Sequence, residues 1–238
     1  MKSFSILTLI FGILSLVFLI LLVFLRTPFP PYPLMSYQDV FDILTPLVLI
    51  PIYWLLFKYP GESSRAEEIF FMVLAAFWVS GQGMHLAANS ISNLIAALAG
   101  STVLDVTGTD LYNLTYFLDE ILSHILWHIG VVGLAVLLIY REWRNPTGQR
   151  TLWWSAIAGG ILYGFTLFSI FLEGQTIAVG IPFVYLVVLF TLIWGRNSLS
   201  QQPILAFFFI SCLVAALLFT GWGVYWGGFP QFSEVGLI

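Results

Sequence analysis

The sequence has few charged side chains. Asp, Glu, Lys and Arg make up 8% of its 238 residues, 60% of the residues are hydrophobic, and the mean hydropathy is +0.97. Soluble domains carry about 25% charged residues, so this composition excludes an ordinary soluble fold. The Lys and Arg residues never cluster, so no nucleic acid partner is expected. Cys212 is the only cysteine, which excludes an intramolecular disulfide and leaves helix packing to hold the fold.

Apolar runs of about 20 residues recur along the chain, and this is the length that a helix needs to cross a bilayer core of roughly 30 Å. We therefore expect one all-α transmembrane domain over residues 1–238, in a multi-pass protein of a plasma or inner membrane. The first run is longer than the apolar core of a signal peptide and has no cleavage site after it, which favours a retained helix. The seven predicted spans lie near 5–25, 40–57, 68–98, 111–140, 152–172, 176–194 and 204–226.

The distribution of cationic residues predicts the orientation of the chain. If seven helices alternate in direction, Arg26 alone falls on one side, and the other cationic residues fall together on the opposite side. The positive-inside rule then places the N-terminus in the cytoplasm and the C-terminus outside. Neither lysine, Lys2 or Lys58, lies within a span, so a retinal Schiff base is disfavoured.

The fourth predicted span carries an unusual polar stretch, YFLDEILSHILWHIG, at residues 116–130. Glu120, His124 and His128 follow one another at intervals of four residues, so a regular helix aligns them in one stripe. Asp119 precedes His124 by five residues and points about 140° away on such a helix. We therefore expect Asp119 to face another helix or a loop.

The third predicted span carries a matching stripe of polar residues. Its members are Gln82, His85, Asn89 and Asn93. Polar groups that face lipid are costly, so both stripes are expected to face inward and toward each other. If the link between the spans turns near residues 104–105, His85 and His124 lie at the same distance from it. The sequence therefore predicts that its three histidines meet at one depth.

This convergence of histidines indicates a metal site. Two histidines four residues apart on a helix can bind one metal ion, and His85 from the neighbouring helix completes a three-nitrogen set with an open fourth position. Zinc is the expected metal, with Glu120 as a further ligand or as the general base. Asn89 and Gln82 are expected to orient a histidine or to hold an oxyanion.

Other interpretations of the same residues remain open. A hydrogen-bonded cluster of the three histidines without a cofactor is a structural alternative. Haem b is an alternative cofactor, with His85 and one histidine of the fourth span as axial ligands and with room for the macrocycle at Gly81, Gly83, Gly130 and Gly133. A metal or proton transporter would use Glu120 and Asp119 as relay stations.

The site chemistry also resembles a known family. Seven spans, Ser80 and His85 on an early helix, and the HxxxH pair His124 and His128 resemble the alkaline ceramidase and adiponectin-receptor superfamily of intramembrane zinc amidases and lipid hydrolases. The resemblance covers about 50 residues. It implies zinc on the three histidines, with Ser80 and a nearby acid polarising a substrate carbonyl. The paired histidines here lie on the fourth span, whereas that family carries them on the last.

The sequence thus predicts a zinc-dependent hydrolase whose substrate is a membrane lipid or a similar amphiphile, because molecules already dissolved in the bilayer reach such a site most easily. The polar residues continue outward from the histidines through Asn89 and Glu120, whereas the inward halves of the same helices are apolar. We therefore expect a cavity that opens on the outer side and a hydrophobic plug on the cytoplasmic side.

Overall fold

The computed structural model describes residues 3–99, 109–195 and 198–237. Within these ranges seven helices are long and apolar enough to cross a membrane, and their positions confirm the predicted spans. The fourth span consists of three successive segments, α4, η1 and α5. The elements are α1 (Ser3–Phe24), β1 (Pro28–Phe29), β2 (Tyr32–Ser36), α2 (Tyr37–Lys58), α3 (Arg65–Ala99), α4 (Asp110–Tyr116), the π-helix η1 (Phe117–Leu122), α5 (Ser123–Arg144), α6 (Trp153–Glu173), α7 (Ile177–Phe190), the π-helix η2 (Thr191–Gly195), the 3₁₀ helix η3 (Leu199–Gln201) and α8 (Pro203–Trp226).

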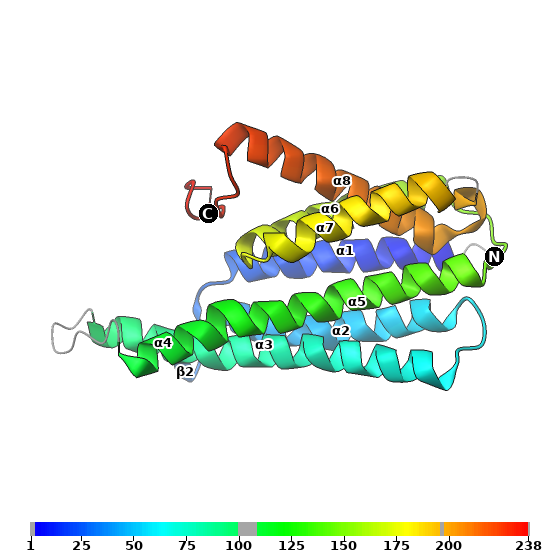
Figure 1. Cartoon of the computed structure of the whole chain (residues 1–238). Helices are drawn as coiled ribbons and strands as arrows, with labels where there is room; N and C mark the ends of the chain where they lie inside the picture. Colours follow the sequence, from blue (N-terminus) through cyan, green and yellow to red (C-terminus); the bar gives the residue numbers. More distant parts are fainter. Residues whose placement is uncertain (1–2, 100–108, 196–197, 238) are drawn as a thin grey trace.

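The helices form one elongated bundle (Figure 1), in which α3 and α4 project beyond the neighbouring helices at the end away from the N-terminus. The Pro-rich link after α1 forms the short antiparallel hairpin β1–β2. It leads directly into α2, which starts with a capping box. The Ser36 hydroxyl accepts a hydrogen bond from the Asp39 amide at 3.2 Å, and the Asp39 carboxylate accepts one from the Ser36 amide at 2.6 Å.

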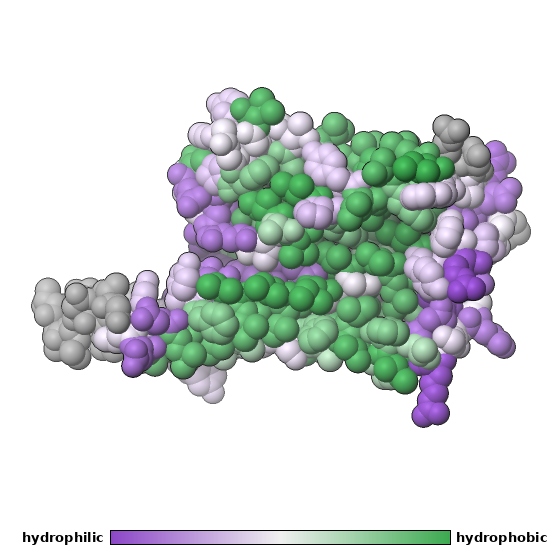
Figure 2. Space-filling model, in the orientation of Figure 1, coloured by the Kyte–Doolittle hydropathy of each residue, from purple (hydrophilic) through white to green (hydrophobic). Residues whose placement is uncertain are grey.

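The surface of the bundle has the polarity that a bilayer requires. Figure 2 shows hydrophobic residues over most of its length and hydrophilic residues gathered mainly toward its two ends. Large apolar side chains are exposed on every one of the long helices, which water would disfavour and lipid tails accept. The chain is therefore a multi-pass membrane protein. The C-terminal ends of α2 and α5 and the start of α3 lie on the side of the N-terminus (Figure 1). Lys58, Arg65 and Arg141 belong to these helix ends, and we call this the cationic end.

A buried arginine ties three elements together at the cationic end. Arg141 of α5 has no exposed surface, and its guanidinium lies 4.3 Å from the ring centre of Phe57. It donates hydrogen bonds to the Phe57 carbonyl at 3.0 Å, to the Glu67 carboxylate at 2.7 Å, and to the carbonyls of Gly61 and Glu62 at 3.1 and 3.3 Å. These contacts join α2, the α2–α3 link and α3 to α5.

Glycines let α3 and α5 approach closely. A Cβ atom added to Gly81 would lie 2.5 Å from the Trp127 amide nitrogen, and one added to Gly130 would lie 2.7 Å from the Leu74 carbonyl oxygen. Only glycine fits at such backbone contacts, which are typical of membrane helix pairs. The predicted antiparallel packing of the third and fourth spans is confirmed, and it sets the register that brings His85 to the histidines of α5.

Helix α8 diverges from the bundle toward its C-terminal end, and the chain then folds back toward α6 (Figure 1). The returning segment, residues 227–237, is anchored on Glu173 at the end of α6. The Glu173 carboxylate accepts a hydrogen bond from the Phe232 amide at 2.6 Å, and its carbonyl accepts one from the Gln231 side chain at 2.6 Å. Phe232 also packs edge-on against Trp222 of α8, with ring centres 5.2 Å apart.

Candidate functional site

The helix that carries the polar stretch is not regular. Residues Phe117–Leu122 form a π-helix, in which the Ser123 amide donates to the carbonyl of Leu118, five residues earlier. The assumption of a regular α-helix through this stretch is therefore wrong. A π-turn holds one residue more than an α-turn, so side chains five positions apart are brought toward the same face. This places Asp119 on the side of His124, against the 140° separation expected from the sequence.

Asp119 is the partner of His85. The Asp119 carboxylate is almost completely buried, and its Oδ1 lies 2.8 Å from His85 Nδ1, although the two groups are poorly aligned for a hydrogen bond. Its other oxygen accepts a hydrogen bond from the Ser92 hydroxyl at 3.1 Å. Asp119 does face another helix, as expected, but that helix is α3 and the contact is with the histidine itself. It thereby fixes the imidazole of His85 through Nδ1.

The two histidines of α5 are also fixed through Nδ1. His124 Nδ1 lies 3.0 Å from the Glu120 carbonyl, to which it can only donate, and His128 Nδ1 lies 2.7 Å from the Thr176 hydroxyl. The His128 ring is fully buried between Trp127 and Phe171, with ring centres 4.7 and 5.0 Å away. Its Nε2 has no hydrogen-bond partner among the described residues.

The three imidazoles form a row across α3 and α5. The ring centres of His85 and His124 are 5.0 Å apart, and those of His124 and His128 are 6.2 Å apart. In a tetrahedral site with metal–nitrogen bonds of about 2.0–2.1 Å, neighbouring imidazole centres lie about 5 Å apart. The first pair has that spacing and the second pair is wider. Accordingly, no group of three or more His, Cys, Asp or Glu side chains in the described part of the chain is already arranged around one metal position.

Gly174 makes the position of His128 possible. A Cβ atom at Gly174 would lie 2.6 Å from His128 Cε1, so any larger residue would displace the ring. Thr176, which binds His128 Nδ1, follows two residues later in the α6–α7 link. Sequence reasoning missed both residues, because nothing in their local pattern relates them to a histidine on another helix.

Two carboxylates of α2 lie beside the three histidines and Asp119, and we call this whole group the polar cluster. The two carboxylates were not among the residues expected at the site from the sequence. Asp42 accepts a hydrogen bond from Gln82 at 2.8 Å, and Asp39 accepts one from Asn89 at 2.7 Å. The expectation that Asn89 and Gln82 orient a histidine is therefore wrong, since both amides bind acids. Asp42 Oδ2 is buried and has no partner among the described residues. The available signal was the spacing of Asp39 and Asp42, which puts both on one face of α2.

Part of the polar cluster lines a cavity of about 260 Å³, namely Asp39, Asp42, His85 and His124, together with Glu120. His128 and Asp119 lie behind its wall and do not line it. Because α5 rises about 1.5 Å per residue, His124 lies roughly 26 Å from Arg141 and so in the half of the bundle away from the cationic end. The lining residues come from α1 and the link after it, α2, α3, the fourth span, α6 and the residue after it, and the returning C-terminal segment. They are Leu19, Leu22, Val23, Arg26, Gln38, Asp39, Asp42, His85, Glu120, His124, Trp127, Ser169, Ile170, Glu173, Gly174 and Gln231.

Ser80 does not belong to the site. Its side chain lies on the exposed face of α3, and it does not line the cavity. The expectation that it polarises a substrate carbonyl is therefore wrong. His85 follows Ser80 by five residues, and on a regular α-helix this spacing directs the two side chains about 140° apart.

The packing between α3 and α5 also bears on the haem and transport alternatives, and it disfavours both. Gly81 and Gly130 hold the two helices in contact and leave no room there for a macrocycle. On the cationic side of His124 and His128, the buried side chains of Trp78 and Val131 belong to the hydrophobic core. The polar cluster therefore has no polar continuation through these side chains toward the cationic end.

Comparisons of the chain with protein-family models, with curated proteins and with solved structures give no match. The function of the site must therefore be inferred from its own chemistry.

Proposed function

We propose that this protein is an intramembrane zinc-dependent hydrolase that acts on a lipid or another amphiphile. The observation that carries this proposal is the common state of the three histidines. Each imidazole is engaged at Nδ1, by Asp119, by the Glu120 carbonyl or by Thr176, and so has Nε2 left for a ligand. Metal-binding histidines are oriented in this way, through the ring nitrogen that does not bind the metal. His124 and His128 have a hydrogen bond at that nitrogen, and at His85 the Asp119 carboxylate lies 2.8 Å from it.

The residues present suit zinc. His85, His124 and His128 would hold the ion through Nε2. The buried Nε2 of His128 has no partner in the described part of the chain and is otherwise costly. Only His85 and His124 already have the spacing of neighbouring ligands. Binding of one ion by all three requires His85 and His128, at the two ends of the row, to close around it, which changes the 6.2 Å pair and the contact of His128 with Thr176. Zinc in such a site polarises a carbonyl oxygen and activates water near neutral pH.

Acidic residues beside the histidines supply the proton chemistry. Glu120 is half-buried and lines the cavity, so its carboxylate is placed to take a proton from the attacking water. Asp42 is a second candidate base, because Gln82 binds one of its oxygens and the other has no partner among the residues that the structure describes. Asn89 is a positioning residue in this scheme, since it holds Asp39 at the cavity wall.

The cavity lies among apolar helices, and this supports a substrate that is already dissolved in the bilayer. By the positive-inside rule, the cationic end faces the cytoplasm, so the cavity opens in the outer half of the membrane. Haem b remains the alternative cofactor, but the glycine contacts between α3 and α5 argue against it. A transporter needs a continuous polar path, which the core around Trp78 and Val131 does not offer.

The proposal is tested by hydrolysis in detergent micelles or nanodiscs. The purified protein is offered a panel of long-chain acyl esters and acyl amides, and released fatty acid is measured by mass spectrometry. We expect one class to be hydrolysed, turnover to stop after treatment with a zinc chelator, and zinc to restore it. Ser80→Ala should keep the wild-type rate because that side chain is exposed. Turnover that persists after verified metal removal would contradict the proposal.

The contact between His85 and Asp119 leads to a further prediction. Neither the family resemblance nor the assumption of a regular α-helix through Asp119 leads to it. Asp119→Asn should weaken zinc binding and turnover by about 10–100-fold, the usual effect of removing a carboxylate that orients a metal-binding histidine. Isothermal titration of the metal-free protein with zinc measures this. Ser92→Ala, which removes only the hydroxyl that binds Asp119, is the matched control and should cost much less. Equal zinc affinity in Asp119→Asn and wild type would rule out this role.

A further inference from the structure

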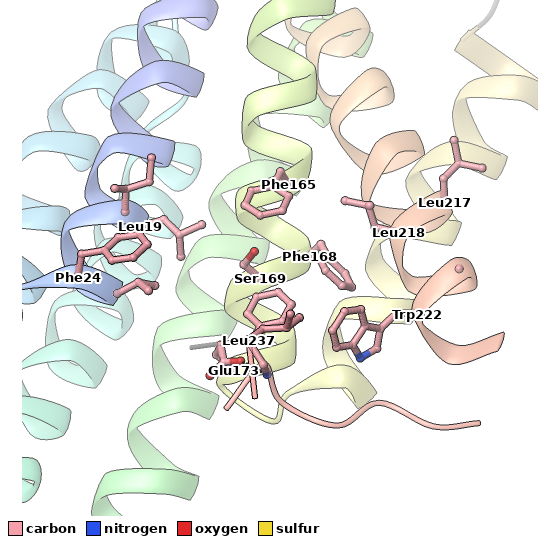
Figure 3. A pocket seen from close by; sticks show the side chains of 14 residues that line it. Leu19, Phe24, Phe165, Phe168, Ser169, Glu173, Leu217, Leu218, Trp222 and Leu237 are labelled. Carbon is pink, nitrogen blue, oxygen red and sulfur yellow. Dashed lines mark hydrogen bonds between the residues drawn. The ribbon is translucent and has the colours of Figure 1, made fainter. Parts of the chain in front are cut away.

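A second cavity lies next to the polar one. It is an apolar groove of about 550 Å³ between α1, α6 and α8, and this volume is typical of ligand pockets. Figure 3 shows Leu19 and Phe24 of α1 on one side, Leu217, Leu218 and Trp222 of α8 on the other, and Phe165 and Phe168 of α6 between them. Its polar lining residues are Ser169 and Glu173.

The apolar groove and the polar cavity share a wall. Leu19 and Val23 of α1 and Ser169 and Glu173 of α6 line both. The groove is thus apolar along its length and polar where it meets the cavity that holds His85 and His124. A ligand that fills both spaces must be apolar in one part and polar in the other.

The returning C-terminal segment covers the same junction. Gln231 lines the polar cavity, whereas Phe232 and Leu237 line the apolar groove. The segment is held there by the hydrogen bonds from Gln231 and Phe232 to Glu173. The segment is therefore polar where it covers the polar cavity and apolar where it covers the groove. This match supports one amphiphilic ligand that lies beneath the segment and fills both spaces.

Charge restricts the polar end of that occupant. The cavity wall carries the carboxyl groups of Asp39, Asp42, Glu120 and Glu173 and one guanidinium, that of Arg26. The four carboxyl groups outnumber the guanidinium and, with it, the two charges of the zinc ion of the proposed function, so acids stay in excess. A phosphate or carboxylate head would meet this excess, and like charges at close range are unfavourable. An uncharged hydroxylated or amide head meets hydrogen-bond acceptors instead.

We infer that the substrate is a single-chain amphiphile with an uncharged polar head. Its acyl chain lies in the groove between α1, α6 and α8, and its acyl carbonyl reaches the cavity at His85 and His124. This inference rests on the proposed function for the reaction at the head, but the binding of the chain is independent of catalysis. The substrate enters sideways from the bilayer, because the groove lies between lipid-facing helices.

Gly221 of α8 provides a direct test. It lines the groove, and a Cβ atom added to it meets no atom within 4 Å, so Gly221→Leu puts a side chain into the groove without a clash. Gly83→Leu is the matched control, since Gly83 is an exposed helical glycine of α3 with equally open surroundings and no place in the groove. Both variants are made in the full chain, and zinc content is measured on each sample.

The probe is a monoacylglycerol with a photoreactive diazirine in its C16 chain, and the labelled peptides are identified by mass spectrometry. We expect labels on the α6 and α8 segments around Phe168 and Leu218, at least fivefold less in Gly221→Leu, and unchanged in Gly83→Leu. The corresponding lysophosphatidic acid should label these segments at least fivefold less than the monoacylglycerol.

Labelling that is equal in Gly221→Leu and wild type, or that is spread evenly over all exposed helices, would overturn the inference. Equal labelling by the phosphate-bearing probe would overturn the head-group assignment. Because labelling needs no turnover, a failure of chain binding in the groove can be distinguished from a failure of the proposed hydrolase activity. A chain that binds the probe in the groove and contains no zinc would refute the proposed function alone.

Discussion

His124→Ala is expected to lower hydrolytic turnover by about 10³-fold or more. His124 stands between the other two histidines, with ring centres 5.0 Å from His85 and 6.2 Å from His128, so its loss separates the remaining ligands. Two imidazoles on different helices then cannot retain the ion, and the several kcal/mol that the metal contributes to the transition state are lost. Released fatty acid per chain, measured at saturating substrate, gives the ratio.

The control for this variant is Asn113→Ala, an exposed polar residue of the same span. It should turn over at the wild-type rate and show the same melting temperature as His124→Ala. A His124→Ala protein that folds normally and retains more than about a tenth of the wild-type turnover would contradict the catalytic role of the histidine row.

Arg141→Met is expected to destabilise the fold by about 1–3 kcal/mol, the usual cost of leaving a buried polar group without its hydrogen-bond partner. The substitution keeps the apolar volume beside Phe57 but leaves the carbonyls of Phe57 and Gly61 without the guanidinium as donor. It also removes the ion pair to Glu67, whose carboxylate keeps its hydrogen bonds from Ser64. Unpaired polar groups are costly where water is scarce. Thermal unfolding in detergent, followed by tryptophan fluorescence, measures the change.

Arg144→Met is the matched control, because Arg144 is exposed near the same helix end and binds only the Tyr140 hydroxyl in the described contacts. It should unfold close to the wild-type temperature. Removing the acid as well, in Arg141→Met/Glu67→Gln, should recover part of the lost stability. Identical melting of Arg141→Met and Arg144→Met would show that the buried network does not hold α2, α3 and α5 together.

The spans and one part of the site could be predicted from the sequence. Apolar length alone determines which segments cross a bilayer, so all seven spans are found within a few residues of their predicted ends. The meeting of His85 and His124 follows from helix register and the cost of placing polar groups against lipid. Both inferences use properties of single helices and of their order along the chain.

The pairing of Asp119 could not be predicted, because it depends on a backbone irregularity. A π-turn is a change of hydrogen-bond pattern over Phe117–Leu122, and no spacing of side chains in this stretch specifies it. The regular-helix assumption therefore placed Asp119 on the wrong face. The same assumption gave Glu120 a place in the histidine stripe, and Glu120 does line the cavity.

The remaining members of the site depend on contacts between helices that are far apart in sequence. Asp42 reaches the cavity through α2, and Gly174 accommodates His128 from the end of α6. Ser80 was assigned by resemblance, and its side chain is exposed on α3 and does not line the cavity. A pattern on one helix cannot show which distant helix packs against it, and three-dimensional packing supplies that information.

Elemental analysis of the purified protein is the most direct test of the central claim. The account predicts about one zinc ion per chain in the wild type and almost none in the double variant His85→Ala/His124→Ala, with Ser80→Ala equal to wild type. An absorption spectrum of the same samples should show no haem band. A folded wild-type protein that takes up no metal when zinc is supplied, or a double variant that keeps its zinc, would contradict the account.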